Sequence, residues 1–355
     1  MTRLTSLIWV LLFAALIIFP STATAAGGSG SNGLAWKMVW AWSTAGMSDA
    51  DVVAQAKSLG FNVLEAQSPG IVRECHRQGI KAAGLIYFGS APEGCAQVIS
   101  PTEEATLRRE EAALPPAYQY GGEPVRHGEV MIEGGLWCFD RPEALEFGKK
   151  EIDRVIAAGY DVIALDYIGY QNYHACFCPI STSRHEEYLK THPGISRKAA
   201  TDECSRDSLV SFYNALVAYA KSKKPQIVVT AHLYPCFIPD PIYGNRTSLD
   251  YCGQTVSWFF QPHWNLGRVR RYAHEVVARA GRYNPSCTGA PFIGIYTLKP
   301  YENDRKTPER VRDEIRIVKE SGAKAIQFAE LGNILNDPEI ARVVREELNP
   351  PIGGH

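Results

Sequence analysis

Short apolar runs alternate with amphipathic stretches along most of this chain. Each run has the length of a β-strand, and near-continuous apolar runs of this kind are typical of strands buried in a parallel sheet. The stretches between them have helical periodicity. The pattern predicts strands at Lys37–Trp42, Phe61–Ala66, Ala82–Phe88, Val162–Tyr167, Gln226–Leu233, Thr255–Gln261, Phe292–Leu298 and Ala325–Glu330.

Glycine and proline mark where the predicted helices end and begin. Gly60, Gly79, Gly159 and Gly322 each lie just before a predicted strand, where a glycine stops a helix. Helix starts are indicated by capping residues followed by proline and glutamate, as in Asp140-Arg-Pro-Glu143, Thr307-Pro-Glu309 and Asp337-Pro-Glu339. We therefore expect Asp140 to cap the helix that runs from Pro142 to Ala158.

Eight strands with intervening helices predict an α/β fold, a single (β/α)8 TIM barrel over residues 34–349. An open doubly wound sheet is the alternative, but no glycine-rich phosphate loop follows the first strand. Long loops are expected after strands three and four, over Gly89–Leu136 and Gln171–Asp202. Such loops lie at the catalytic face of a barrel and often determine specificity.

The N-terminus has the pattern of a secretory signal peptide. Arg3 precedes an apolar run from Leu7 to Phe19, and Ala23-Thr-Ala25 fits a cleavage site. An uncleaved membrane anchor is the weaker interpretation, because a span needs about 20 apolar residues. We expect a signal peptide at 1–25, a flexible leader at 26–33, a C-terminal tail at 350–355 and a secreted, periplasmic or extracellular protein.

Charge and cysteine content indicate which binding partners and cross-links to expect. The formal net charge is −1 and no Lys/Arg run is present, which argues against a nucleic-acid surface. The chain has nine cysteines, and export predicts that they form disulfides. Cys236 and Cys252 are a plausible pair, and the loops around strand four carry Cys138, Cys176, Cys178 and Cys204. The Cys176-Phe-Cys178 spacing is not that of a zinc site, so neither metal nor cofactor is expected.

Alternation along each strand decides which side chains enter the barrel. Asp166 faces inward at the C-terminal end of strand four, where barrel enzymes place their active sites. An aromatic-rich loop and not a helix follows it, which disfavours a capping role. By the same alternation His232, Gln261 and Tyr296 end the inward faces of strands five, six and seven. We expect these four side chains to meet at one mouth, although a structural role for His232 is equally compatible with the sequence.

A second carboxyl group and a set of aromatic residues complete the candidates. Glu330 at the end of the last strand is favoured as a general acid, although its parity places it with helix-facing residues; Glu65 at the end of strand two ranks slightly lower. Aromatic rings at strand ends suit stacking on sugar rings. The remaining candidates for substrate binding are Trp40, Trp42, Tyr87, Tyr167, His263 and Trp264.

The stretch from Trp137 to Tyr170 resembles the middle of (β/α)8-barrel glycoside hydrolases, in which a helix leads through a glycine into a strand that ends in Asp. The matching pieces are Arg141-Pro-Glu143, Ala158-Gly-Tyr160 and Val162-Ile-Ala-Leu-Asp166. In retaining families of the α-galactosidase, α-amylase and α-fucosidase kinds that Asp is the nucleophile. The resemblance implies the same role for Asp166.

The sequence departs from each of these families elsewhere. His232 stands where the α-amylase pattern has a Glu, and Gln261-Pro-His-Trp264 stands where the α-galactosidase pattern has an acid. The spaced acids of the chitinase-like pattern on strand four are also missing. The resemblance is therefore to the superfamily, and the acid/base partner of Asp166 stays open.

These features predict a secreted glycoside hydrolase that cleaves a polysaccharide or oligosaccharide, with Asp166 as nucleophile or base and a second carboxyl as general acid. A carbohydrate-binding barrel without catalysis is the alternative. A metal-dependent hydrolase is disfavoured because strand one ends in Trp40-Ala-Trp42 and not in a His-x-His pair. The sequence does not specify the sugar, the linkage or the oligomeric state.

Overall fold

The structure is a computed structural model that describes residues 33–112 and 134–349. The predicted signal peptide, most of the leader and the C-terminal tail lie outside these residues, so export stays a prediction. The strands are β1 (Trp36–Trp40), β2 (Val63–Glu65), β3 (Lys81–Tyr87), β4 (Val162–Asp166), β5 (Val228–Leu233), β6 (Tyr251–Ser257), β7 (Thr288–Gly289), β8 (Phe292–Gly294) and β9 (Ala325–Ala329).

The strands form one closed parallel barrel. Hydrogen bonding runs in the order β5-β4-β3-β2-β1-β9-β8-β6, and β5 pairs with β6 to close the ring. Both β7 and β8 pair with β6, β7 near its start and β8 near its end. Together they form one strand of the barrel, which is interrupted around Pro291 because proline has no backbone N–H for the hydrogen-bond ladder. The predicted eight-stranded barrel is confirmed.

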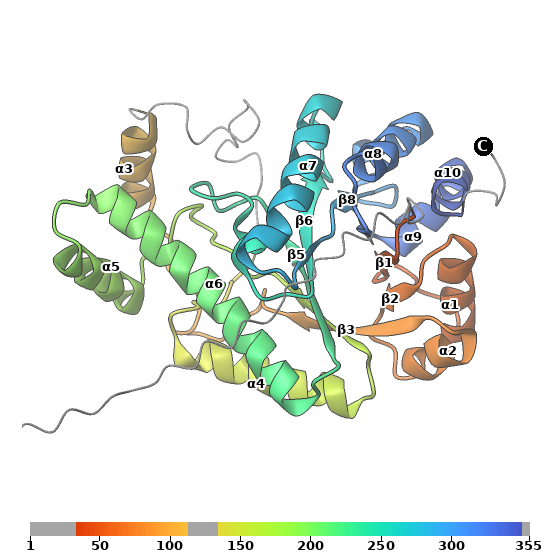
Figure 1. Ribbon diagram of the computed structural model, residues 1–355, viewed down its shortest axis with the longest axis horizontal. Coiled ribbons are helices and arrows are strands. Elements are labelled where there is room, and N and C mark those ends of the chain that lie inside the picture. The colour runs from red at the N-terminus through yellow and green to blue at the C-terminus, as the bar shows by residue number, and fades with distance from the viewer. Residues whose placement is uncertain (1–32, 113–133, 350–355) are drawn as a thin grey trace, which may run out of the picture. The chain divides into compact units, whose positions relative to one another are not determined.

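Helices follow the strands and cover the barrel from outside. They are α1 (Asp49–Ser58), α2 (Ile71–Gln78), α3 (Pro101–Ala112), α4 (Pro142–Ala157), α5 (Pro179–Thr191), α6 (Arg197–Lys223), α7 (Leu266–Tyr283), α8 (Pro308–Glu320), α9 (Leu331–Leu335) and α10 (Pro338–Leu348). Figure 1 shows α1 and α2 beside β1 and β2, with α4 and α6 side by side at another part of the ring. None of the helices in the described part of the chain has the length and apolarity needed to cross a membrane.

The predicted helix ends are largely confirmed. Gly60, Gly79, Gly159 and Gly322 all have positive φ, the left-handed conformation that ends a helix. Thr307 and Asp337 cap α8 and α10 by accepting backbone N–H bonds. The prediction for Asp140 is wrong, because Arg141 occupies the cap position of α4. The Asp140 carboxylate instead accepts from the hydroxyls of Ser181 and Ser208 and pairs with Arg184.

Two further expectations need correction. The segment predicted as a long loop after strand four contains α5 and the start of α6. Strand six begins at Tyr251, four residues before the predicted start, and ends at Ser257. It begins there because the Asp250 carboxylate accepts from Val229 N of β5 at 2.7 Å and thereby aligns the two strands.

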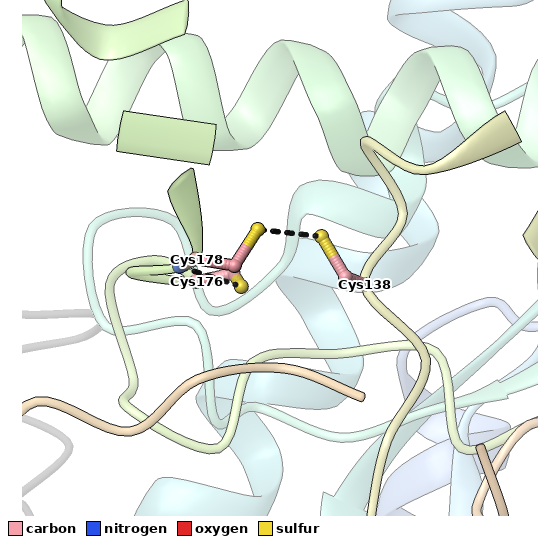
Figure 2. A group of neighbouring side chains, drawn as sticks. All are labelled: Cys138, Cys176 and Cys178. Atoms are coloured by element: carbon pink, nitrogen blue, oxygen red, sulfur yellow. Dashed lines mark hydrogen bonds between the residues drawn. The ribbon is translucent and has the colours of Figure 1, made fainter. Parts of the chain in front are cut away.

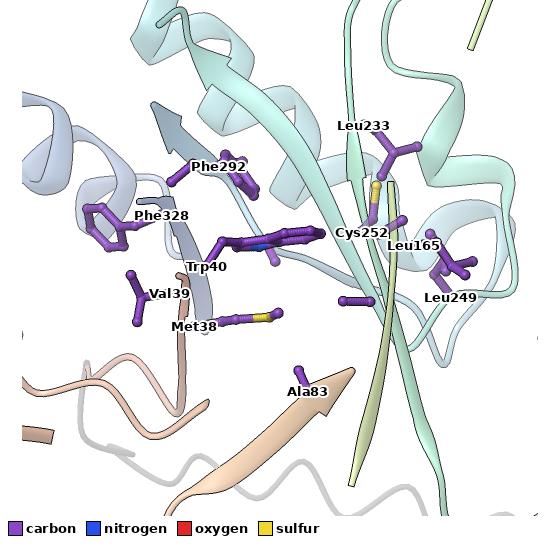
Figure 3. Close-up of a cluster of buried hydrophobic side chains, with 14 of the residues drawn as sticks. Met38, Val39, Trp40, Ala83, Leu165, Leu233, Leu249, Cys252, Phe292 and Phe328 are labelled. Atoms are coloured by element: carbon purple, nitrogen blue, oxygen red, sulfur yellow. The ribbon is translucent and has the colours of Figure 1, made fainter. Parts of the chain in front are cut away.

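The barrel interior is filled by alternating inward side chains. Figure 3 shows Met38 and Trp40 on one side of β1, toward Phe292, and Val39 on the other side near Phe328. Trp40 has no exposed surface, and its indole N–H donates to Gln327 at 3.3 Å. The predicted disulfides are not present, since all nine cysteines, which lie within residues 33–112 and 134–349, are free thiols. The core is therefore held by packing and by polar contacts between strands.

Candidate functional site

Asp166 is the last residue of β4 and faces the mouth of the barrel, as alternation predicts. Only 4% of its surface is exposed. Its Oδ1 accepts from Tyr167 N at 2.9 Å, and Tyr167 has a φ of +63°, a conformation that non-glycine residues rarely adopt. This sharp turn directs the chain away from the strand and leaves the carboxylate at the strand end.

His232 of β5 fixes the other side of Asp166. Its Nδ1 lies 3.3 Å from Asp166 Oδ1, and its Nε2 lies 2.9 Å from Thr255 Oγ1. The ring stacks on Phe292 with centroids 3.9 Å apart and has no exposed surface. Because the imidazole is held at Nε2 and on one face and is fully buried, it lies against Asp166 but has little freedom to reach a substrate.

Asp166 opens into a cavity of about 380 Å³. Among the described residues that line it, Asp166 is the only carboxylate. The other lining residues are largely aromatic and come from the end of β3 and from the segments that follow the strands. They are Trp42, Ser43, Leu85, Tyr87, Tyr167, Tyr234, Tyr296, Leu298, Lys299, Tyr301 and Asn333.

The aromatic lining has both exposed and buried members. Trp42 is 45% exposed and Tyr301 41%, so their faces are open to a ligand. Tyr167 packs between Tyr87 and Tyr234, at centroid distances of 4.5 and 5.6 Å. Burial, with the charge of Asp166 in second place, raises the pKa of Tyr167 and of Tyr234. Their phenols therefore stay protonated and can donate hydrogen bonds to hydroxyl oxygens.

Glu65 is a second carboxyl group at the same end of the barrel. It ends β2, is 1% exposed, and accepts a hydrogen bond from Ala41 N at 3.3 Å. Burial raises the pKa of Glu65 to about 8, and the charges of Asp166 and Glu330 act in the same direction. Glu65 lines a second cavity, of about 510 Å³, and Trp42 lines both cavities. Glu65 is therefore a carboxylic acid that carries its proton at neutral pH.

Glu330 has a different position from the one expected of a general acid. It caps α9, has no exposed surface and does not line the Asp166 cavity. Its carboxylate accepts from the backbone N–H of Ser43, Gly332 and Asn333 and from the Asn333 side chain. These four donors fix the carboxylate in place as the cap of α9. Glu65 does not line the Asp166 cavity either, but it lines the neighbouring cavity beside Trp42 and does not serve as a helix cap, which favours it over Glu330 as proton donor.

The structure separates the other predicted residues into two groups. It brings Trp42, Tyr87, Tyr167 and Tyr296 to the cavity wall around Asp166. Trp40 lies buried beneath the site, and Trp264 is 3% exposed with Arg268 stacked on its ring. Gln261 and His263 lie beyond the end of β6 and do not line the cavity, because β6 ends four residues earlier than predicted.

Several lining residues escaped the sequence analysis. Lys299 and Tyr301 follow β8 in a segment without periodicity, and Ser43 follows the predicted end of strand one. Asn333 accepts from Thr297 N and Leu298 N through its side-chain oxygen and so joins two segments of the wall. Its place just after the last strand, in Glu330-Leu-Gly-Asn333, was the one signal that could have identified it.

The structure shares its fold with glycoside hydrolases. The glycoside hydrolase domain of PgaB (BpsB) from Bordetella bronchiseptica has a TM-score of 0.56 at 12% identity, over 88% of this chain and 98% of that one. A β-galactosidase from the psychrophilic Marinomonas ef1 has a TM-score of 0.55 at 11% identity, over 88% of this chain and 59% of that one. The spore cortex-lytic enzyme SleL from Bacillus megaterium has a TM-score of 0.51 at 8% identity, over 90% and 75% of the two chains.

No protein-family model matches this chain, and neither does any curated protein sequence. The similarity to solved structures therefore shows the (β/α)8 fold alone. Function has to be inferred from the residues of the site. The chain spans 59% of the length of the Marinomonas β-galactosidase and nearly all of the PgaB domain.

Proposed function

We propose that this protein is a glycoside hydrolase with Asp166 as its nucleophile or base and Glu65 as its general acid. The observation that carries the proposal is a pair of buried carboxyl groups at the C-terminal end of one barrel, of which Glu65 has its pKa raised to about 8 by burial. Asp166 is oriented by Tyr167 N and lies beside His232, whereas burial keeps Glu65 protonated at neutral pH. Glycosidic cleavage normally requires one ionised and one protonated carboxyl group.

The two groups have separate tasks in this reaction. Glu65 would protonate the glycosidic oxygen as the bond to the leaving sugar breaks, and Asp166 would attack the anomeric carbon or activate the water that does so. His232 acts through Asp166, because its imidazole lies against that carboxylate and is enclosed by Thr255 and Phe292. We regard it as a positioning residue.

A carbohydrate suits the cavity that contains Asp166. Exposed rings at Trp42, Tyr87 and Tyr301 offer flat apolar surfaces, which pack against the apolar faces of sugars. Protonated phenols at Tyr167 and Tyr234, and the Asn333 side chain, offer polar groups for hydroxyls. The proposed substrate is a polysaccharide or oligosaccharide that reaches both cavities beside Trp42.

A screen of polysaccharides and oligosaccharides tests the proposal. The purified full chain is incubated with each glycan, released reducing ends are quantified, and binding is measured by affinity electrophoresis on the same panel. The proposal predicts release from at least one glycan that also binds. Binding without release from any glycan would instead support the alternative of a carbohydrate-binding barrel.

A further inference from the structure

Three cysteines from two separate segments meet near the wall of the candidate site. Cys138 precedes α4, and Cys176 and Cys178 lie in the segment between β4 and α5. Their Sγ atoms all lie within 4.8 Å of one another, and Cys138 Sγ is 3.5 Å from Cys178 Sγ. Figure 2 shows the sulfurs of Cys138 and Cys178 facing one another across the gap between the segments. All three side chains are buried.

Backbone N–H groups donate to the Cys176 sulfur, and the Ser181 hydroxyl, which donates its own proton to Asp140, lies beside the other two. Val98 N and Cys178 N each lie 3.4 Å from Cys176 Sγ and donate to it. The Ser181 hydroxyl lies 3.4 Å from Cys138 Sγ and 3.5 Å from Cys178 Sγ. Backbone N–H groups directed at a sulfur favour its thiolate form, which is the form that binds metals. The Asp140 carboxylate stands behind Ser181 and is paired with Arg184.

The spacing of the sulfurs fits a metal better than a disulfide. Zinc–sulfur bonds of about 2.3 Å in a tetrahedral site place neighbouring sulfurs about 3.8 Å apart. The Cys138–Cys178 separation of 3.5 Å is within a few tenths of an ångström of that value. A disulfide requires about 2.05 Å between one pair and leaves the third thiol buried and unpaired. One cation could instead be reached by all three sulfurs, which lie within 4.8 Å of one another, and by the Ser181 hydroxyl beside two of them.

We propose that Cys138, Cys176 and Cys178 bind one thiophilic cation, zinc in the first instance, with the fourth position taken by the Ser181 hydroxyl or by water. Thiolates select soft or borderline cations such as Zn²⁺ and Cu⁺ over Mg²⁺ and Ca²⁺. The sequence predicts disulfides for these cysteines and not a metal site, because Cys138 lies on the other side of β4 from the other two. Only the fold brings Cys138 to the Cys176-Phe-Cys178 pair.

The proposed metal site would have a structural role in the enzyme. It joins the segment before α4 to the segment that runs from Tyr167 to α5, and Tyr167 lines the Asp166 cavity. Gln97 links the same two segments, because its side-chain amide donates to Trp137 O and Gly169 O. A bound cation would strengthen this link and hold the loop after Asp166 in place. It would stand apart from the reacting groups, so the inference does not depend on the proposed hydrolysis.

Metal binding by the reduced full chain tests the proposal. The chain is titrated anaerobically with Cd²⁺, a spectroscopic substitute for Zn²⁺, and the thiolate-to-cadmium absorption is recorded along with bound metal after gel filtration. We expect one ion per chain, and at least about tenfold weaker binding in Cys176→Ser and in Cys178→Ser. Cys75→Ser, at a buried thiol of α2, is the matched control and should bind as the wild type does. Equal binding by all variants, or no stoichiometric binding, would overturn the proposal.

Two measurements on the unaltered chain cover the case in which the variants do not fold. X-ray absorption of the zinc-loaded protein should show about three sulfur neighbours near 2.3 Å from the metal. A shell of nitrogen and oxygen alone would contradict the site. Peptide mapping of protein purified without reductant should show the three cysteines uncrosslinked, whereas a bridge between any two of them would replace the metal site with a disulfide.

Discussion

At the residue scale, Asp166 and Glu65 have different surroundings although both end strands of the same barrel. Asp166 is next to an imidazole and a backbone donor, while Glu65 is 1% exposed and has a single donor at Ala41. Burial therefore dominates at Glu65 and raises its pKa to about 8. Glycosidic cleavage needs one carboxyl group that holds its proton at neutral pH, and the burial of Glu65 supplies it.

The first prediction concerns the pH profile of hydrolysis. Because Glu65 loses its proton near pH 8, activity should fall as the pH rises through about 8. Glu65→Gln should lower kcat about 10²- to 10⁴-fold and remove this alkaline limb. The profile is measured from initial rates across the pH range, with the exposed Glu302→Gln as the matched control. An alkaline limb that persists unchanged in Glu65→Gln would show that another group supplies the proton.

The second prediction concerns folding stability and the same carboxyl. The pKa of Glu65 is higher in the folded chain than the usual value, so the folded state binds its proton more tightly. This contribution to stability is complete below about pH 4.5 and is lost as the pH rises toward 8. The loss amounts to at most roughly 5 kcal/mol. Urea unfolding of wild type and Glu65→Gln at pH 5 and pH 9 should therefore show a smaller pH dependence in the variant.

At the scale of the element, the end of the last strand explains why Glu330 lies away from the Asp166 cavity. The residue lies one position beyond β9, and its carboxylate turns back to cap α9 and to bind Ser43 N after β1. Alternation along a strand predicts side-chain direction only while the strand continues. Glu65, in contrast, is still within β2 at the level of Trp40, where the direction of alternation holds.

The third prediction compares two helix caps. Glu330→Ala leaves buried N–H donors without an acceptor, which costs about 3 kcal/mol or more of unfolding free energy. Asp337→Ala, at the more ordinary cap of α10, should cost about 1 kcal/mol. Chemical denaturation of both variants gives the comparison. Similar small losses for the two would mean that Glu330 is not the structural residue described above, and its role as an acid would have to be reconsidered.

At the scale of the whole molecule, the sequence predicted the barrel because the signals for it are local and repeated. Apolar runs, helix-stopping glycines and capping residues recur with each βα unit, and Gly60, Gly79, Gly159 and Gly322 all adopt the expected conformation. The prediction also placed Asp166 at the barrel mouth. It misplaced Gln261 because Trp258, Phe259 and Phe260 continue the apolar run of β6 after the strand has ended. Their packing on Trp264 and Tyr296 is a tertiary contact that no periodicity reveals.

The fourth prediction uses the arrangement of the two cavities. Trp42 follows β1 and lines both the Asp166 cavity and the cavity that Glu65 reaches. Loss of its ring should weaken binding of glycans long enough to extend into both cavities, so Trp42→Ala should raise KM for long substrates roughly tenfold. Short substrates should be affected less. Steady-state kinetics on an oligosaccharide series measures this difference, and an equal effect at every length would contradict the extended site.

The central claim is that Asp166 takes part directly in breaking a glycosidic bond. Its most direct test is proton NMR of glycan hydrolysis by wild type, Asp166→Asn and the control Asp313→Asn, a change on the exposed face of α8. The account predicts that wild type and Asp313→Asn release a product of one anomeric configuration, and that Asp166→Asn is slower by at least about 10³-fold while it remains folded. Hydrolysis by Asp166→Asn at the wild-type rate would contradict it.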